Sequence, residues 1–187
     1  MSTEVRTPSE APGDLDLVRR FVNTLDIETG DDDLGSSAEA RAWLGGEGWR
    51  ATVGKREHVE LVQVREAIRD LVSLRGTDAD GNAVATFDAI ARRHPLVLQL
   101  SSPEVLAPSS ERGVDGFVGR VLAIVAAAEL DGSWDRMKAC ANHGCRWLFY
   151  DHSRNRSRTW CSMDICGSQA KMRAYRDRRR AAGSPAG

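Results

Sequence analysis

Cys140-Ala-Asn-His-Gly-Cys145 and Cys161-Ser-Met-Asp-Ile-Cys166 together contain every cysteine of this 187-residue chain. Each stretch has the spacing Cys-x4-Cys, and fifteen residues separate the two pairs. Four thiolates held on tight turns complete the tetrahedral shell of a structural zinc ion and leave no coordination position for water or substrate. The sequence therefore predicts one structural Zn²⁺ per chain, bound by Cys140, Cys145, Cys161 and Cys166.

Two alternatives for these cysteines are disulfide bonding and a ligand set that includes histidine. Residues 1–13 lack the basic start and continuous apolar core of a secretory signal, so we expect a cytoplasmic protein, in which disulfides are rare. His143 and His152 could serve as ligands, but four cysteines already fill the shell. We expect both histidines on exposed turns.

Short elements are expected around the cysteine pairs. Residues 146–150 are predicted to form a strand that pairs with Thr159-Trp160 in a hairpin, across a basic turn at 151–158. Gly144 is expected to provide the backbone freedom that the first turn needs. The aromatic residues of this region are expected to form a small core rather than to stack on nucleic-acid bases. They are Trp147, Phe149 and Trp160.

A final helix is predicted from Ser168, its expected N-cap, to about Arg180. The last cysteine ligand then lies at the positive end of the helix dipole, which favours a thiolate. Met172 and Tyr175 share one helix face and are expected to pack on the zinc core. The order of knuckle, hairpin and helix predicts a treble-clef-like zinc finger over residues 133–181.

Upstream of the finger, apolar residues recur at helical spacing. Helices are predicted in residues 14–25, 36–44, 55–75, 83–93 and 114–130, the last one central and buried. Two short apolar segments, 96–100 and 105–107, predict a small β-hairpin. The predicted fold class is α+β, mainly α, with a helical N-terminal domain over residues 14–132 followed by the finger.

Charge is divided unevenly along the chain, although the net charge is only −1. Residues 136–187 contain 12 Lys and Arg against 3 Asp and Glu, a net charge of +9, which leaves residues 1–135 at −10. A basic region confined to one end of a chain suggests a polyanionic partner. No apolar run approaches the roughly 20 residues of a membrane span, so no membrane partner is expected.

The finger region resembles a known family. Its segments WLFYDHSRNRSRTWCSMDIC (147–166) and CGSQAKMRAYRDRRR (166–180) are similar to the bacterial CGNR-type zinc finger. Upstream, Leu15-Asp16-Leu17-Val18 and Phe21-Val22-Asn23-Thr24 resemble the ABATE domain of proposed stress-induced transcription regulators. The resemblance spans residues 15–180 and implies a bacterial, zinc-dependent, DNA-binding transcriptional regulator. This chain departs from the family's Cys-Gly-Asn-Arg motif, because Ser168 and Gln169 replace the asparagine and arginine.

The candidate DNA contacts lie in the basic turn and the final helix. The planar guanidinium of arginine binds phosphate oxygens and guanine edges. Arg173, Arg176 and Arg180 share one face of the predicted helix. We predict DNA contacts from Arg154, Arg156, Arg158, Gln169, Lys171, Arg173, Arg176 and Arg180.

Two other functional classes are open to this sequence. Basic faces are often only solvated surface, so the finger could instead be a zinc-stabilised module that binds protein or RNA without sequence-specific DNA binding. For an enzyme, the sequence lacks a nucleophile elbow, a phosphate-binding Gly-rich loop and HExxH, and His58 and His94 lie in surface-like contexts without recognisable partners. We therefore predict that the protein is not an enzyme.

The acidic N-terminal domain is large enough to enclose a pocket. We expect it to be the regulatory half of the protein, the place where an effector or a protein partner binds. Asn23, a polar residue on an otherwise apolar helix, is expected to bond backbone groups rather than a ligand.

Overall fold

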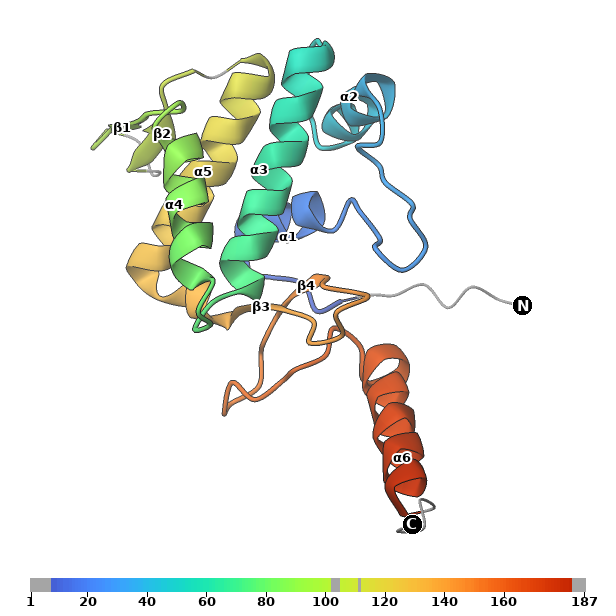
Figure 1. Ribbon diagram of the computed structural model, residues 1–187. Coiled ribbons are helices and arrows are strands. Elements are labelled where there is room, and N and C mark those ends of the chain that lie inside the picture. Colours follow the sequence, from blue (N-terminus) through green and yellow to red (C-terminus); the bar gives the residue numbers. More distant parts are fainter. Residues whose placement is uncertain (1–7, 102–104, 111, 183–187) are drawn as a thin grey trace.

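The computed structural model describes residues 8–101, 105–110 and 112–182 (Figure 1). A helical body comes first in the chain and a finger extends from one end of it. The elements of the body are α1 (Leu15–Val22), α2 (Ser37–Gly46), α3 (Lys55–Ser73), α4 (Asp80–Ala91), β1 (Leu96–Leu98), β2 (Leu106–Pro108) and α5 (Gly113–Asp131). The elements of the finger are η1 (Ser133–Arg136), β3 (Met137–Ala139), β4 (Leu148–Tyr150), η2 (Met163–Gly167) and α6 (Ser168–Ala182). This architecture confirms the predicted α+β, mainly α fold.

The core of the body lies where α1, α3 and α5 pack together. Phe117 of α5 is fully buried, and its ring lies 5.1 Å from Phe21 and 5.7 Å from both Trp43 and Trp49. Such edge-to-face pairs add to the free energy gained by burying the rings. Ser36 caps α2 by accepting a hydrogen bond from the Glu39 amide, and the helix continues to Gly46, two residues beyond its predicted end.

The predicted hairpin of the body is present as the antiparallel pair β1–β2, with Leu96 opposite Pro108 and Leu98 opposite Leu106. It packs on α5 at Gly119, where an added Cβ would lie only 2.6 Å from the Cβ of Pro108. Helix α5 ends at Asp131 and is capped by Gly132, whose φ of +77° suits glycine. No helix in the described ranges is both long and apolar enough to cross a membrane.

The finger shares its core with the body. Met137 and Leu148 are fully buried in the same cluster as the residues of α1, α3 and α5, and Trp134 and Tyr150 join them. The predicted pairing of residues 146–150 with Thr159-Trp160 is wrong: β4 pairs with β3, with Met137 opposite Tyr150. Pairing with β3 brings apolar side chains of both strands onto the body, a gain that Thr159-Trp160 could not supply.

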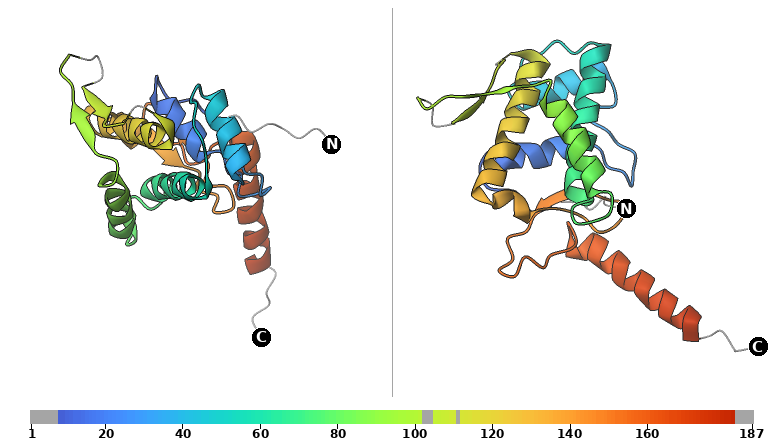
Figure 2. Two further views of the ribbon diagram at one scale, coloured as in Figure 1. Left: turned by 90° about the horizontal axis from the view of Figure 1, so that it is seen from above. Right: turned by 60° about the vertical axis from the view of Figure 1, so that its left-hand side comes forward.

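Helix α6 leaves the molecule instead of packing on it, as Figure 1 and both views of Figure 2 show. The predicted packing of Met172 and Tyr175 on the zinc core is therefore wrong, and each side chain is 55% exposed. The periodicity of α6 was correctly predicted, but the axis of a helix depends on contacts that its own sequence does not contain. Every residue from Lys171 to Arg180 is exposed.

Two histidines of the body differ from the surface contexts predicted for them. His94 is 7% exposed, and its Nε2 lies 3.0 Å from the Glu60 carboxylate. The Nε2 of His58 lies 2.6 Å from the Leu34 carbonyl oxygen. Both partners are more than 20 residues away in the chain, so the local sequence around each histidine does not indicate them.

Candidate metal centre and nucleic-acid interface

The four predicted ligands come together as a single buried cluster. The Sγ atoms of Cys140, Cys145, Cys161 and Cys166 all lie within 4.8 Å of one another, and each residue is at most 3% exposed. Cys145 and Cys161 are 3.6 Å apart and Cys161 and Cys166 3.7 Å apart, measured between sulfur atoms. Four sulfurs bound to one zinc ion at about 2.3 Å would lie about 3.8 Å apart, whereas disulfide sulfurs lie about 2 Å apart. The arrangement fits a tetrahedral zinc site and excludes a disulfide.

The first cysteine pair lies on a turn between β3 and β4. The amides of Cys145 and Arg146 both donate to the Asn142 carbonyl oxygen, at 2.7 Å and 3.1 Å. The left-handed residue of this turn is Arg146, with φ +51°, and not Gly144 as predicted. The amide of Cys140 donates to the Trp147 carbonyl oxygen, which fixes the first ligand to the start of β4.

The second cysteine pair lies at the start of the last helical segment. Ser162 caps this segment by accepting a hydrogen bond from the Ile165 amide, so the helical turns begin at η2 and not at the predicted cap, Ser168. Cys166 is therefore held within the first helical turns, where dipole and free amides favour its thiolate form. The direction of α6 is coupled to the metal site through this residue.

The crowded sulfurs perturb each other's ionisation. Hydrogen bonds from Cys145 and Cys161 lower the pKa of Cys140, whereas the contact with Cys140 raises the pKa of both Cys145 and Cys161. Four adjacent thiolates need a central cation, and a bound zinc ion would supply that charge. The cluster includes neither His143 nor His152, both of which are exposed.

The aromatic residues form the predicted small core around the cysteines. Phe149 is fully buried, and Trp147 and Trp160 are partly buried against the same cluster. Their packing against the cysteine cluster agrees with the structural role that the sequence predicts for them.

The predicted basic turn is a loop after β4 that extends from the same end of the molecule as α6 (Figure 1). Buried Asp151 organises this loop: its carboxylate accepts from Lys138 Nζ at 2.7 Å and from the Arg158 amide at 3.0 Å. Lys138 also donates to the Arg156 and Arg158 carbonyl oxygens. Asp151 and Lys138 were not among the predicted functional residues, although a lone acid in a basic turn is a usable signal for such an ion pair.

The three predicted arginines of this loop lie in different environments. Arg154 and Arg156 are exposed, with one Arg156 nitrogen 3.5 Å from Asp135. Arg158 turns inward: its Nε donates to the Trp160 carbonyl oxygen at 2.8 Å, it bonds Ser9, and its guanidinium lies 5.0 Å from the centre of the Phe149 ring. Arg158 therefore stabilises the finger in this structure.

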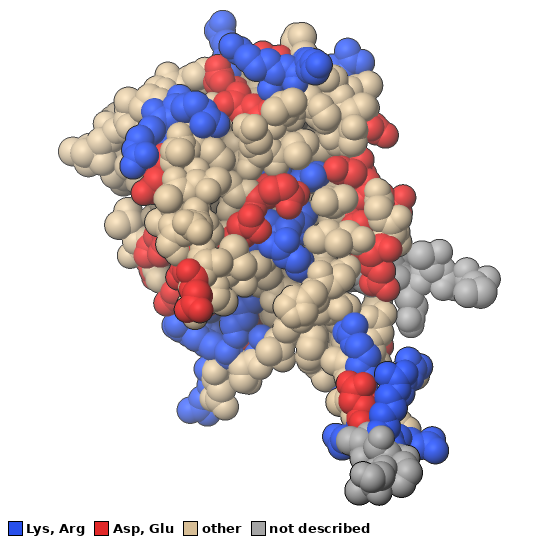
Figure 3. Space-filling model, viewed as in Figure 1, with Lys and Arg blue, Asp and Glu red and all other residues tan. Residues whose placement is uncertain are grey.

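The predicted residues of α6 divide in the same way. Lys171, Arg176 and Arg180 are exposed on the projecting helix, and Figure 3 shows Lys and Arg side chains gathered along it. Gln169 and Arg173 instead reach back to Asn142, at 3.1 Å each. The structure thus presents a free cationic surface on the distal turns of α6 and a hydrogen-bonded network at its base.

Comparison with protein-family models places two domains in the chain. Residues 15–132 match the family ABATE, described as "Putative stress-induced transcription regulator", and residues 136–179 match the CGNR zinc finger. The chain belongs to the ABATE family. Neither matching family is an enzyme family, and a search among curated proteins found no match.

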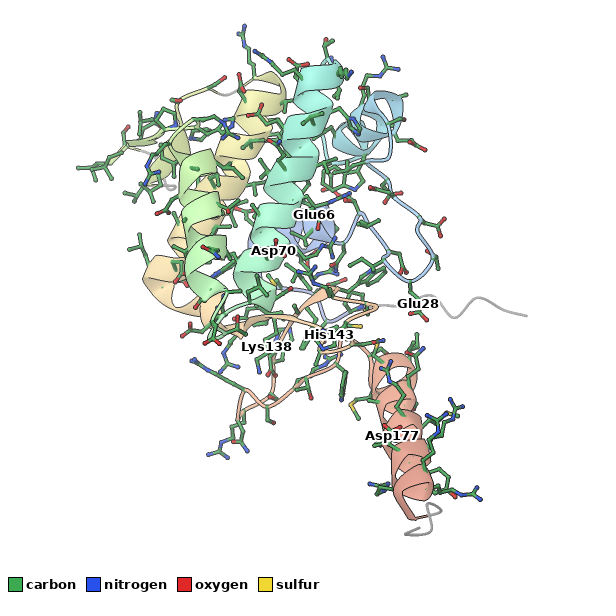
Figure 4. All side chains as sticks on the ribbon, viewed as in Figure 1. Glu28, Glu66, Asp70, Lys138, His143 and Asp177 are labelled. Atoms are coloured by element: carbon green, nitrogen blue, oxygen red, sulfur yellow. The ribbon has the colours of Figure 1, made fainter. Side chains whose placement is uncertain are left out.

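Polar contacts fix the CGNR finger to the ABATE domain. Asn23 donates to the Leu148 carbonyl oxygen at 2.9 Å and accepts from the Leu148 amide at 2.7 Å, which confirms its predicted backbone role across 125 residues of chain. Asp70, marked in Figure 4, pairs with Arg146 at 2.5 Å. Arg69 of α3, fully buried, donates to the Arg146 carbonyl oxygen of the finger at 3.3 Å and to the Val22 carbonyl oxygen at the end of α1 at 2.6 Å. The zinc turn is therefore held directly by α1 and α3.

Proposed function

We propose that this ABATE protein is a zinc-dependent, DNA-binding transcriptional regulator in the bacterial cytoplasm. The observation that carries the proposal is α6: a helix exposed over ten successive residues, rich in arginine, and anchored at its base beside a four-cysteine site. An arginine-bearing helix of this width can enter the major groove, while arginines of an adjoining loop contact phosphates. Zinc would be structural and would hold the helix and loop in a fixed relation.

Within this interface we assign different roles to the exposed cations. Arg154 and Arg156 of the loop, together with Lys171 on the other side of α6, are proposed to bind phosphates, and Arg176 and Arg180, which share a helix face, to face the groove. Arg173 and Gln169 would contribute at the base of the helix, and Arg158 would act mainly by holding the loop. Gln169 could pair with adenine, so Gln169→Arg should shift base preference toward guanine.

Salt dependence tests this proposal in the full-length, zinc-loaded protein. A fluorescent 25-base-pair duplex of random sequence is titrated over a range of KCl concentrations. If about five phosphates are neutralised, log affinity should fall with log salt at a slope of roughly −4 to −5. Arg156→Ala should flatten the slope by about one unit, whereas the control Arg56→Ala, which removes an exposed cation of the ABATE domain, should leave it unchanged.

Sequence selection from a random duplex pool tests base reading. Arg176→Ala should relax discrimination between selected and random duplexes by roughly 1 to 3 kcal/mol, because a guanine contact is lost. A flat salt slope, or selection that yields no preferred sequence, would favour the second candidate function.

That second candidate is a zinc-stabilised module that binds protein or RNA. The half-exposed Met172 and Tyr175 favour it, because these apolar side chains line one face of α6 beside the cations. Two measurements separate the candidates. The first is binding to the same random pool prepared as RNA, and the second is DNA binding by the double variant Met172→Ala plus Tyr175→Ala. DNA binding that survives loss of both side chains supports the first.

We further propose that the ABATE domain is the regulatory half. A largely apolar cavity of about 730 Å³ lies between the start of α1, the hairpin and α5, within the size range of small-molecule sites. Its wall includes Leu15, Leu106 and Ile124. Filling it with Ala127→Trp should abolish enhancement of 1-anilinonaphthalene-8-sulfonate fluorescence if this cavity admits apolar effectors.

A further inference from the structure

Asn142 occupies an unusual position for a polar side chain, because it lies inside the first cysteine turn and is only 6% exposed. Its Nδ2 donates to Cys166 Sγ at 3.8 Å and to Gln169 Oε1 at 3.1 Å. Its Oδ1 accepts from the Gly144 amide at 3.4 Å and from the Arg173 guanidinium at 3.1 Å. One side chain thus joins the first cysteine turn, the last cysteine ligand and two successive turns of α6.

The partners of Asn142 fix which end of its amide faces which group. Cys166 and Gln169 present acceptors, whereas Gly144 and Arg173 present donors. The reversed amide would place its NH₂ group against both of those donors, so only one orientation satisfies the network. A zinc-bound thiolate at Cys166 would strengthen the N–H···S bond, since charged acceptors make stronger hydrogen bonds.

Helix α6 has few other anchors. Its residues 171–180 are exposed, and an isolated helix of about 15 residues is only marginally stable in water. Gln169 and Arg173 are four residues apart and therefore lie on the same helix face, the face toward the zinc site. Two hydrogen bonds to one rigid side chain restrict the direction of the helix axis more than one bond could.

Gln169 extends the network to the ABATE domain. Its Nε2 lies 3.4 Å from the Glu28 carboxylate, in the acidic loop between α1 and α2. Figure 4 shows Glu28 directly above the start of α6. A connected path of hydrogen bonds therefore runs from the zinc site through Asn142 and Gln169 to the N-terminal domain.

We propose that Asn142 is the positioning residue that fixes the direction of α6 relative to the zinc site, and that Gln169 connects this helix to the acidic loop through Glu28. The proposal rests on the proposed DNA-binding function for its consequence, because the direction of α6 sets the angle at which its arginines meet a duplex. Asn142 itself is not expected to touch DNA.

Amide hydrogen exchange in the full-length, zinc-loaded chain tests the positioning role without any DNA. Asn142→Ala should retain one zinc per chain and exchange the amides of residues 170–180 about tenfold faster, the factor expected when one to two net hydrogen bonds are lost. The control Asn82→Ala makes the same chemical change at an exposed site on α4 and should leave α6 unaffected. Unchanged α6 exchange with zinc still bound would overturn the proposal.

A second variant covers the case in which Asn142→Ala releases zinc. Gln169→Ala removes one hydrogen-bond partner of Asn142 without altering the cysteine turns, and should speed exchange in α6 about threefold. No acceleration there would also refute the proposal.

Duplex binding then separates the two hypotheses. Faster α6 exchange in Asn142→Ala together with about tenfold weaker DNA binding supports both. If the wild-type chain binds no duplex, the proposed function fails, while the exchange data still decide whether Asn142 positions the helix.

Discussion

Helices α5 and α6 are similar in length but lie in opposite environments: 11 of the 19 residues of α5 are buried, whereas residues 171–180 of α6 are all exposed. Packing of an apolar surface stabilises α5, so we expect this helix to form around Phe117 even when the cysteines bind no metal. Helix α6 is fixed at one end only, by Cys166 and Asn142. The contrast shows that burial of apolar side chains holds the body together, whereas the exposed basic helix is anchored only at its base, by hydrogen bonds and by its continuity with the cysteine cluster.

Removing one zinc ligand should have the largest effect, because it should unfold α6 and leave α5 folded. Cys161→Ser should reduce the zinc content from one ion per chain to nearly none, because structural zinc binding contributes apparent free energies of about 10 to 16 kcal/mol in small zinc domains. We expect residues 140–180 to unfold while α1–α5 persist, with loss of α6 helicity by circular dichroism. Elemental analysis measures the zinc content, and exchange of the α3 and α5 amides shows whether the body stays folded. Retained zinc, or an ordered α6 without zinc, would contradict the assignment.

Truncation of one aromatic residue in each helix sharpens the comparison. Phe117→Ala should lower the free energy of unfolding by about 3 to 5 kcal/mol, because a fully buried ring is replaced by a cavity. The matched change Tyr175→Ala, at a half-exposed aromatic residue of α6, should alter it by less than about 0.5 kcal/mol. Urea unfolding followed by tryptophan fluorescence gives both values. Equal effects would mean that α6 packs on the molecule in solution.

The buried ion pair of the basic loop should give the finger a distinct acid sensitivity. Burial raises the pKa of Asp151, but hydrogen bonds from Lys138 and Ser153 outweigh it, and the net pKa lies well below the ordinary value. Since the folded-state pKa is the lower one, its stabilisation is complete above about pH 5 and is lost as pH falls below about 4. Asp151→Asn should lower the free energy of unfolding by about 2 to 3 kcal/mol at pH 7, because hydrogen bonds to a charged acceptor are lost.

Comparison of the two proteins across pH isolates this contribution from acid release of zinc, which affects both alike. The stability difference between wild type and Asp151→Asn should shrink as pH falls from 6 to 3. A difference that stays constant over this range would show that the carboxylate is not responsible.

The smallest expected effect concerns the junction between the two regions. Asn23→Ala removes both hydrogen bonds to the Leu148 backbone and should cost about 1 to 2 kcal/mol. Zinc content should not change, because no ligand is touched. Exchange of the β3 and β4 amides should rise more than exchange in α5. Uniform acceleration throughout the chain would indicate that the junction is not a separate weak point.

Local sequence patterns determined the metal site and most of the secondary structure of this protein. The spacing of four cysteines predicted the metal site, since tight turns place paired ligands by themselves. Helical periodicity predicted α1, α3, α5 and α6, and two apolar segments predicted the β1–β2 hairpin. The charge division and the finger motifs indicated the family and the basic surface. Each of these signals depends on residues close together in the chain.

Only the tertiary structure decided the choice among partners. The sequence offered Thr159-Trp160 as a partner for β4, but β3 pairs with it because that register buries Met137 and Leu148 against the body. Likewise, Arg158 and Arg173 carry the same charge as Arg154 and Arg176, yet their guanidinium groups are hydrogen-bonded to the Trp160 carbonyl oxygen and to Asn142. These contacts form only after distant segments meet, and neither periodicity nor spacing records which acceptor will then lie within reach of a flexible arginine.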